Sequence, residues 1–77
     1  MNKTISLKKD TTLVEVLDKI KDAKEVILII PPDNKDFLKE ITYKILKEQI
    51  DSLGKKVYIY SPEKRIIKLA KENGINV

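Results

Sequence analysis

Few residue types in this chain could carry out chemistry. Its 77 residues include no histidine and no cysteine, so the commonest general base, the commonest metal ligand and thiolate chemistry are excluded. Catalysis would have to use carboxylates, lysines, tyrosines or hydroxyl groups. The two glycines, Gly54 and Gly74, stand where helices should end, whereas a phosphate-binding loop needs glycines where a helix begins. The sequence therefore indicates neither a nucleotide-binding loop nor any cofactor.

Three aspartates follow the first two expected strands. Asp10 comes after the first strand, and Asp33 and Asp36 come after the second. Ligands of open parallel sheets bind beyond the carboxyl ends of the strands, so these carboxylates could hold Mg²⁺ in a phosphoryl-transfer or hydrolase site. In the competing interpretation Asp33 and Asp36 cap the next helix, as Thr12 and Ser61 cap theirs. Because capping alone accounts for the spacing, we expect no metal site and no enzymatic activity.

A second set of candidate residues lies on the third expected strand. Tyr58 and Tyr60 share one face of this strand, and Lys55 and Lys56 come just before them. Aromatic rings beside basic residues on a sheet face can stack the bases of single-stranded RNA. The alternative is that both rings pack beneath a helix with their hydroxyls at the rim. Since parallel sheets usually have both faces covered, we expect packing and keep RNA or anion binding as the second hypothesis.

The apolar run Val26–Ile30 is the element around which the rest of the chain is organised. Five consecutive branched aliphatic residues, followed by Pro31 and Pro32, favour an extended strand that ends at the prolines. Side chains of a strand alternate between its two faces, so both faces of this strand are apolar. The pattern therefore predicts a central parallel strand that helices cover on both sides.

Other segments alternate with this strand. Lys3–Leu7 has one polar face, which is typical of a strand at a sheet edge. Val57–Tyr60 also alternates, and Ile75–Val77 suits a short last strand. One helix should begin at the capping box of Thr12–Glu15, and another at Pro62.

The longest expected helix runs from about Lys35 to Leu53. Its predicted apolar side consists of Phe37, Leu38, Ile41, Ile45, Ile50 and Leu53. Tyr43, Leu46 and Ile50 lie partly outside that stripe and could support a homodimer.

The alternation β-α-β-α-β-α-β predicts one small α/β domain, residues 1–77. We expect a mainly parallel, Rossmann-like sheet of four strands with right-handed crossovers, packed with three helices. Strand order 3-2-1-4 would bury the second strand, whereas the polar face of the first strand favours an edge position. The sequence does not decide between this order and one with the first strand at an edge, so the strand order stays open.

The composition limits the kinds of partner that we expect. The net charge is +4, but Arg65 is the only arginine among 16 basic residues, and a lysine-rich surface is more typical of solubility than of nucleic-acid reading. No apolar run approaches the roughly 20 residues of a membrane helix, and we expect no signal peptide. We expect a cytoplasmic protein whose partner is unknown, with a protein partner or a second copy ahead of nucleic acid.

Two resemblances rest on quoted segments. The capped first helix, the "VILIIP" strand, the long helix ending in "LGKKV" and the closing "A-x-x-x-G-I" resemble an uncharacterised small α/β domain of candidate-phylum bacterial proteins. That resemblance implies a fold and no activity. "VILIIPPD" and "KKVYIYSPEKRIIKLAKENGI" are similar in outline to the ribosomal-protein and kink-turn RNA-binding family. The Gly-Asn-Glu helix start of that family has no counterpart here.

The layout also resembles an idealised or designed α/β protein. Its helices have start signals, its loops are minimal, and charges of both signs are interspersed. The sequence as a whole therefore predicts a non-enzymatic, self-folding structural or interaction domain.

Overall fold

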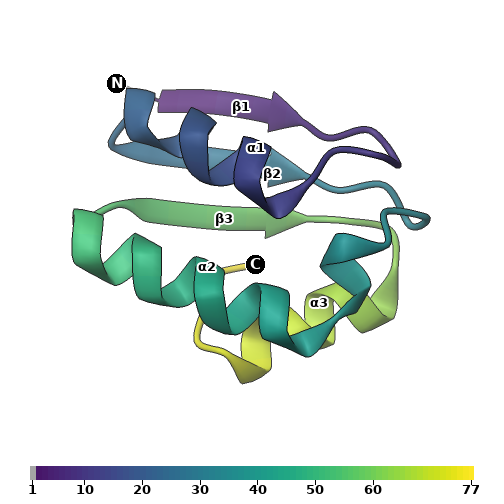
Figure 1. The fold of residues 1–77 in the computed structure, drawn as a ribbon. Coiled ribbons are helices and arrows are strands. Elements are labelled where there is room, and N and C mark those ends of the chain that lie inside the picture. The colour runs from purple at the N-terminus through teal and green to yellow at the C-terminus, as the bar shows by residue number, and fades with distance from the viewer. Residues whose placement is uncertain (1) are drawn as a thin grey trace.

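A computed structural model describes residues 2–77 and contains the expected alternation of strands and helices (Figure 1). In chain order the elements are β1 (Asn2–Ser6), α1 (Leu13–Lys19), the 3₁₀ turn η1 (Ile20–Asp22), β2 (Glu25–Ile29), the 3₁₀ turn η2 (Asp36–Leu38), α2 (Glu40–Leu53), β3 (Lys56–Tyr60) and α3 (Lys64–Glu72). All pairings are parallel, in the order β1-β2-β3. The chain is a small compact α/β domain with a parallel sheet.

The prediction of a fourth strand is wrong, because the sheet formed by residues 2–77 has three strands. Asn76 forms only an isolated parallel bridge with Tyr58 of β3. Gly74, at φ 74°, turns the chain back from α3, and the Ile75 N–H donates to the Ala70 carbonyl oxygen at 2.9 Å. Ile75 therefore closes the end of α3, and the segment pairs with β3 at a single position.

The strand order settles which face of the sheet is covered. β2 is central, as the order 3-2-1-4 predicts, but that order is wrong in placing a fourth strand beside β1, which lies at an edge as its polar face predicts. Because each strand is added in the same direction, right-handed crossovers place α1 and α2 on one face. Helix α3 packs beside α2 near β3 (Figure 1). The prediction of helices on both faces is wrong, since a second helical layer requires the order to reverse.

The core lies between the covered face and the helices. Val26 and Leu28 of β2 are fully buried, whereas Ile27 and Ile29 on the opposite face are 41% and 36% exposed. The other strands, the helices, the 3₁₀ turns and the loop after β1 contribute Ile5, Leu7, Val16, Ile20, Phe37, Tyr43, Leu46, Ile50, Val57, Ile59, Ile66, Leu69 and Ala70 to the same cluster. The apolar run of β2 is therefore buried on one face only.

Helix α2 differs from its prediction in both its start and its buried side. It begins at Glu40, after Phe37 has been buried within η2. Its buried apolar side chains are Tyr43, Leu46 and Ile50. Ile41 and Ile45, expected in the core, are 57% and 40% exposed. The three residues considered for a homodimer therefore belong to the core.

Local signals at helix ends are partly confirmed. Thr12 caps α1, with its hydroxyl accepting from the Glu15 N–H at 3.3 Å, and Gly54 ends α2 at φ 64°. Helix α3 begins later than predicted: its cap is Glu63, whose carboxylate accepts from the Arg65 N–H. Within residues 2–77 no helix combines the length and apolar character that a membrane span needs.

Candidate binding face

The face of the sheet opposite α1 and α2 carries a short array of aligned side chains. In register, Thr4, Ile27 and Tyr58 form one row across the three strands. The next row toward the carboxyl ends is Ser6, Ile29 and Tyr60. Neither row contains a charged residue. We call these six residues the open face.

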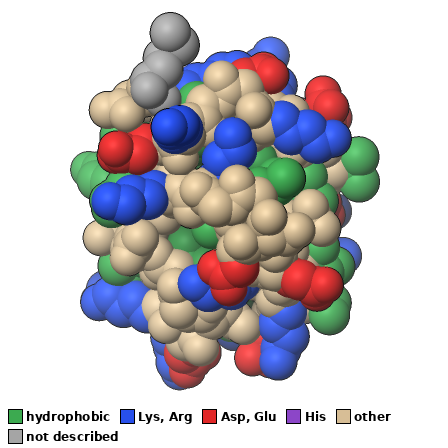
Figure 2. All heavy atoms as spheres, turned by 90° about the vertical axis from the view of Figure 1, so that its left-hand side faces the viewer, with side chains coloured by type: hydrophobic (Ala, Val, Ile, Leu, Met, Phe, Trp, Pro, Cys, Tyr) green, Lys and Arg blue, Asp and Glu red, His purple; other side chains and the backbone are tan. Residues whose placement is uncertain are grey.

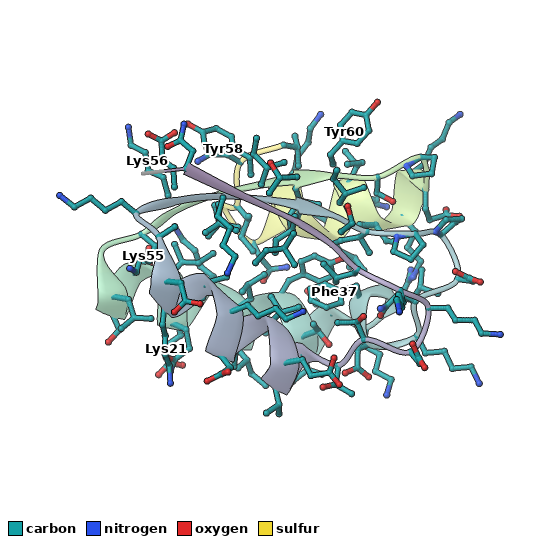
Figure 3. All side chains as sticks on the ribbon, turned by 90° about the horizontal axis from the view of Figure 1, so that it is seen from above. Lys21, Phe37, Lys55, Lys56, Tyr58 and Tyr60 are labelled. Atoms are coloured by element: carbon teal, nitrogen blue, oxygen red, sulfur yellow. The ribbon has the colours of Figure 1, made fainter. Side chains whose placement is uncertain are left out.

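Helices α1 and α2 lie on the other side of the sheet from these tyrosines. Figure 3, seen along the sheet, shows Tyr58 and Tyr60 projecting away from the side on which α1 lies. Tyr60 is 68% exposed, and Tyr58 is half-buried. Together with Ile27 and Ile29 they make a contiguous apolar and aromatic surface, because residues opposite each other on adjacent strands are neighbours. The expectation that the two rings pack beneath a helix is therefore wrong.

The two lysines predicted as binding residues separate. Lys56 precedes Tyr58 by two positions, so it projects on the same face, and its register partner is Glu25. Lys55 lies on the other side, where its ammonium group donates to the Lys21 carbonyl oxygen at 3.2 Å (Figure 3). Lys56 can contribute to a site on the open face, and Lys55 stabilises the end of η1.

At the end of the molecule where the strands begin, the described side chains form no patch of a single sign. Lysine and carboxylate side chains are interspersed on it, between small apolar areas (Figure 2). The pairs Lys3–Asp22, at 3.3 Å, and Lys47–Asp51, at 3.0 Å, are exposed ion pairs that contribute little to stability.

A groove follows directly after β3. It has a volume of about 520 Å³ and is lined by Ser61, Pro62, Lys64, Ile67, Lys68, Lys71 and Glu72. The Arg65 Nε donates to the Leu38 carbonyl oxygen at 3.2 Å, so Arg65 faces η2, which precedes α2. Ile67 stands about 200° further around the helix, so the groove lies on the side of α3 away from η2. Three of its side chains are lysines.

The aspartates beyond the carboxyl ends of the strands lie near one another. Asp10, Asp33 and Asp36 line a surface hollow of about 390 Å³ with Lys9 and Lys35. The Asp36 carboxylate accepts from the Leu13 N–H at 2.9 Å and so caps α1 from another element. Within residues 2–77 no three acidic side chains are arranged to hold a metal ion.

Asn34, rather than Asp33, organises this end of the sheet. Its side-chain amide is fully buried and donates to the carbonyl oxygens of Lys8 and Thr11, at 2.8 and 2.9 Å. Its oxygen accepts from the Phe37 N–H at 3.2 Å. Asn34 therefore joins the loop after β1 to the loop after β2, and the polar groups at this edge serve the structure.

Tyr43 shows how a tyrosine in this fold behaves when it is covered. It is fully buried, its hydroxyl donates to the Phe37 carbonyl oxygen, and its ring meets Phe37 edge to face at 5.7 Å. Burial raises the pKa of its hydroxyl well above the usual value, and the positive charge of Arg65 offsets part of that effect. Tyr58 and Tyr60 have no such surroundings.

The exposure of Ile27 and Ile29 is what sequence reasoning missed. Their partners on β1 gave a signal, because Thr4 and Ser6 share their face and are polar. Helices pack more readily on the apolar face of a sheet than on a face where a neighbouring strand presents hydroxyl groups. The groove along α3 was also missed, since its lysines look like an ordinary solvated helix face.

Comparison of the chain with models of known families, with curated proteins and with solved structures finds no match.

Proposed function

We propose that this chain is a non-enzymatic interaction domain that binds its partner on the open face of its sheet. The observation that carries the proposal is the register that places Ile27, Ile29, Tyr58 and Tyr60 side by side on a face that no helix of residues 2–77 covers. Apolar and aromatic side chains gathered in this way on a small domain mark an interaction surface.

The non-enzymatic part of the proposal is supported by the use of the polar groups at the other candidate position. Beyond the carboxyl ends of the strands, Asp36 caps α1 and Asn34 joins two loops. Thr12 caps α1 as well. Groups committed to these hydrogen bonds hold the loops in place, which is a structural task.

Backbone amide NMR shifts test the proposal against three kinds of partner. The protein would be diluted to detect self-association, and titrated separately with a short single-stranded RNA and with an acidic amphipathic helical peptide. At least one arm should shift amides of β2 and β3. If every arm left these strands unchanged, or if shifts were confined to the loops around Asp36, the proposal would be wrong.

A matched pair of variants sharpens this test. Ile29→Asp places a carboxylate on the open face and should abolish the shifts. Val14→Asp makes the same kind of change on α1, where Val14 is 74% exposed, and should leave them intact. Equal effects of the two variants would show that the open face has no special part in binding.

A further inference from the structure

Tyr58 and Tyr60 are spaced for consecutive flat ligands. Residues two apart on a strand project on the same face about 6.6 Å from one another. Tyr60 is 68% exposed, and Tyr58 is flanked by Ile27 on one side and by Asn76 on the other. Exposed aromatic rings on a sheet are stacking platforms for the bases of an unpaired strand, and they accept any base because each has a π-face.

The size of the open face favours such a ligand over a folded protein. Even the whole face of the sheet, with three strands about 4.8 Å apart and five residues each at about 3.3 Å per residue, spans only roughly 250 Å². A stable protein interface buries about 800 Å² on each partner. One third of the open face is also the hydroxyl-bearing side of β1, whereas packed sheets need apolar inner faces. Two or three stacked bases fit this area without further surface.

Charge around the open face suits a polyanion. Its two rows contain no carboxylate. Lys56 stands next to Tyr58 on the same face, opposite the carboxylate of Glu25 on β2. The groove that begins directly after Tyr60 carries Lys64, Lys68 and Lys71 against the single carboxylate of Glu72. A strand whose bases stack on the tyrosines would leave its phosphates free to reach these ammonium groups, which attract the backbone without reading sequence.

Hydroxyl groups on the far strand of the same face, beyond Ile27 and Ile29, bear on the type of sugar. Thr4 and Ser6 lie on the same face in the rows of Tyr58 and Tyr60. Hydroxyls can donate to and accept from a ribose 2′-OH, the group that distinguishes RNA from DNA. We infer that the open face binds single-stranded RNA, with bases stacked on Tyr58 and Tyr60 and phosphates against Lys56 and the α3 lysines. This inference rests on the function proposed above.

Fluorescence anisotropy with a labelled single-stranded hexanucleotide RNA tests it, using the whole chain at low and at physiological salt. We expect measurable binding that weakens as salt rises, as phosphate contacts require. Tyr60→Phe keeps the stacking ring and should bind like the unmodified protein. Tyr60→Leu keeps an apolar side chain without a ring and should bind roughly tenfold more weakly. Tyr60 is exposed, so neither change should affect folding.

Control variants separate the effect of the groove lysines from the effect of the overall charge of the protein. Lys68→Gln, in the groove, should reduce the salt dependence, while Lys44→Gln on the exposed side of α2 should leave it unchanged. Equal loss in both would overturn the role of the groove.

The remaining outcomes are distinct. Equal affinity of the Tyr60→Leu and Tyr60→Phe variants would overturn base stacking, and equal binding of single-stranded DNA would overturn the assignment to RNA. No binding at low salt would remove RNA as the ligand. The proposed interaction function would survive that result if amides of β2 and β3 still shifted on self-association or with the peptide, and would fail with it if they did not.

Discussion

Tyr43 is fully buried, whereas Tyr60 is exposed. The buried hydroxyl of Tyr43 should make the stability of the fold depend on pH. Because burial raises its pKa above the usual 10.0, Tyr43 stays protonated in the folded protein at a pH where the unfolded chain ionises. Its contribution to stability is complete below pH 10 and is lost as pH rises above that value. The loss can reach about 1.4 kcal/mol per pH unit.

Urea unfolding at pH 8 and at pH 11 measures this effect in the native sequence and in Tyr43→Phe. The native sequence should lose more free energy of unfolding between the two conditions, because the variant lacks the ionisable group. All other side chains are identical in the two proteins, so the difference between them isolates the Tyr43 hydroxyl. Parallel pH dependence in the two proteins would contradict the buried position of this hydroxyl.

Residue-level signals were predictable from sequence where they act within a few positions. The Thr12 cap and the Gly54 helix end follow from local backbone needs, and both are confirmed. Asp36 was assigned to the wrong helix, because its carboxylate caps α1, 23 positions earlier in the chain. The buried role of Asn34 was missed for the same reason: a side chain that bonds to a distant loop leaves no periodic pattern.

At the scale of elements, the amide of Asn34 is the main polar link between the two loops at the carboxyl ends of β1 and β2. Removing it leaves the carbonyl oxygens of Lys8 and Thr11 and the Phe37 N–H without this partner. Asn34→Ala should lower the free energy of unfolding by about 2–3 kcal/mol.

Chemical denaturation checks this prediction, with Asp33→Ala as the matched control. Asp33 is the exposed neighbour of Asn34, and its substitution should change stability by less than about 0.5 kcal/mol. A similar loss in both variants would mean that the loop, rather than the amide, carries the effect.

The sequence predicted which segments form helices and strands better than it predicted which side of each element is buried. Helix α2 has apolar residues on more than one side, and the sequence pattern alone favoured the side of Ile41 and Ile45. The buried side is instead the one on which Tyr43 can pack against Phe37, a residue held in η2. Choosing between such sides needs the position of the preceding turn, which periodicity within the helix does not contain.

At the scale of the whole molecule, strand order decides which surfaces are available. Alternating strands and helices predicted a parallel α/β domain, but not that the order 1-2-3 would place α1 and α2 on one face. The apolar run predicts a second buried face at Ile27 and Ile29, but both side chains are partly exposed. They belong to the surface on which both proposals depend.

Thiol labelling tests the exposure of that surface directly, since the chain has no cysteine of its own. Ile27→Cys and Val26→Cys place one thiol on each face of β2, at neighbouring positions. In the folded protein the thiol at position 27 should react nearly as fast as in urea. The thiol at position 26 should react at least about a hundredfold more slowly than in urea, since reagent reaches it only when the protein unfolds. Equal protection of the two thiols in dilute protein would contradict the open face.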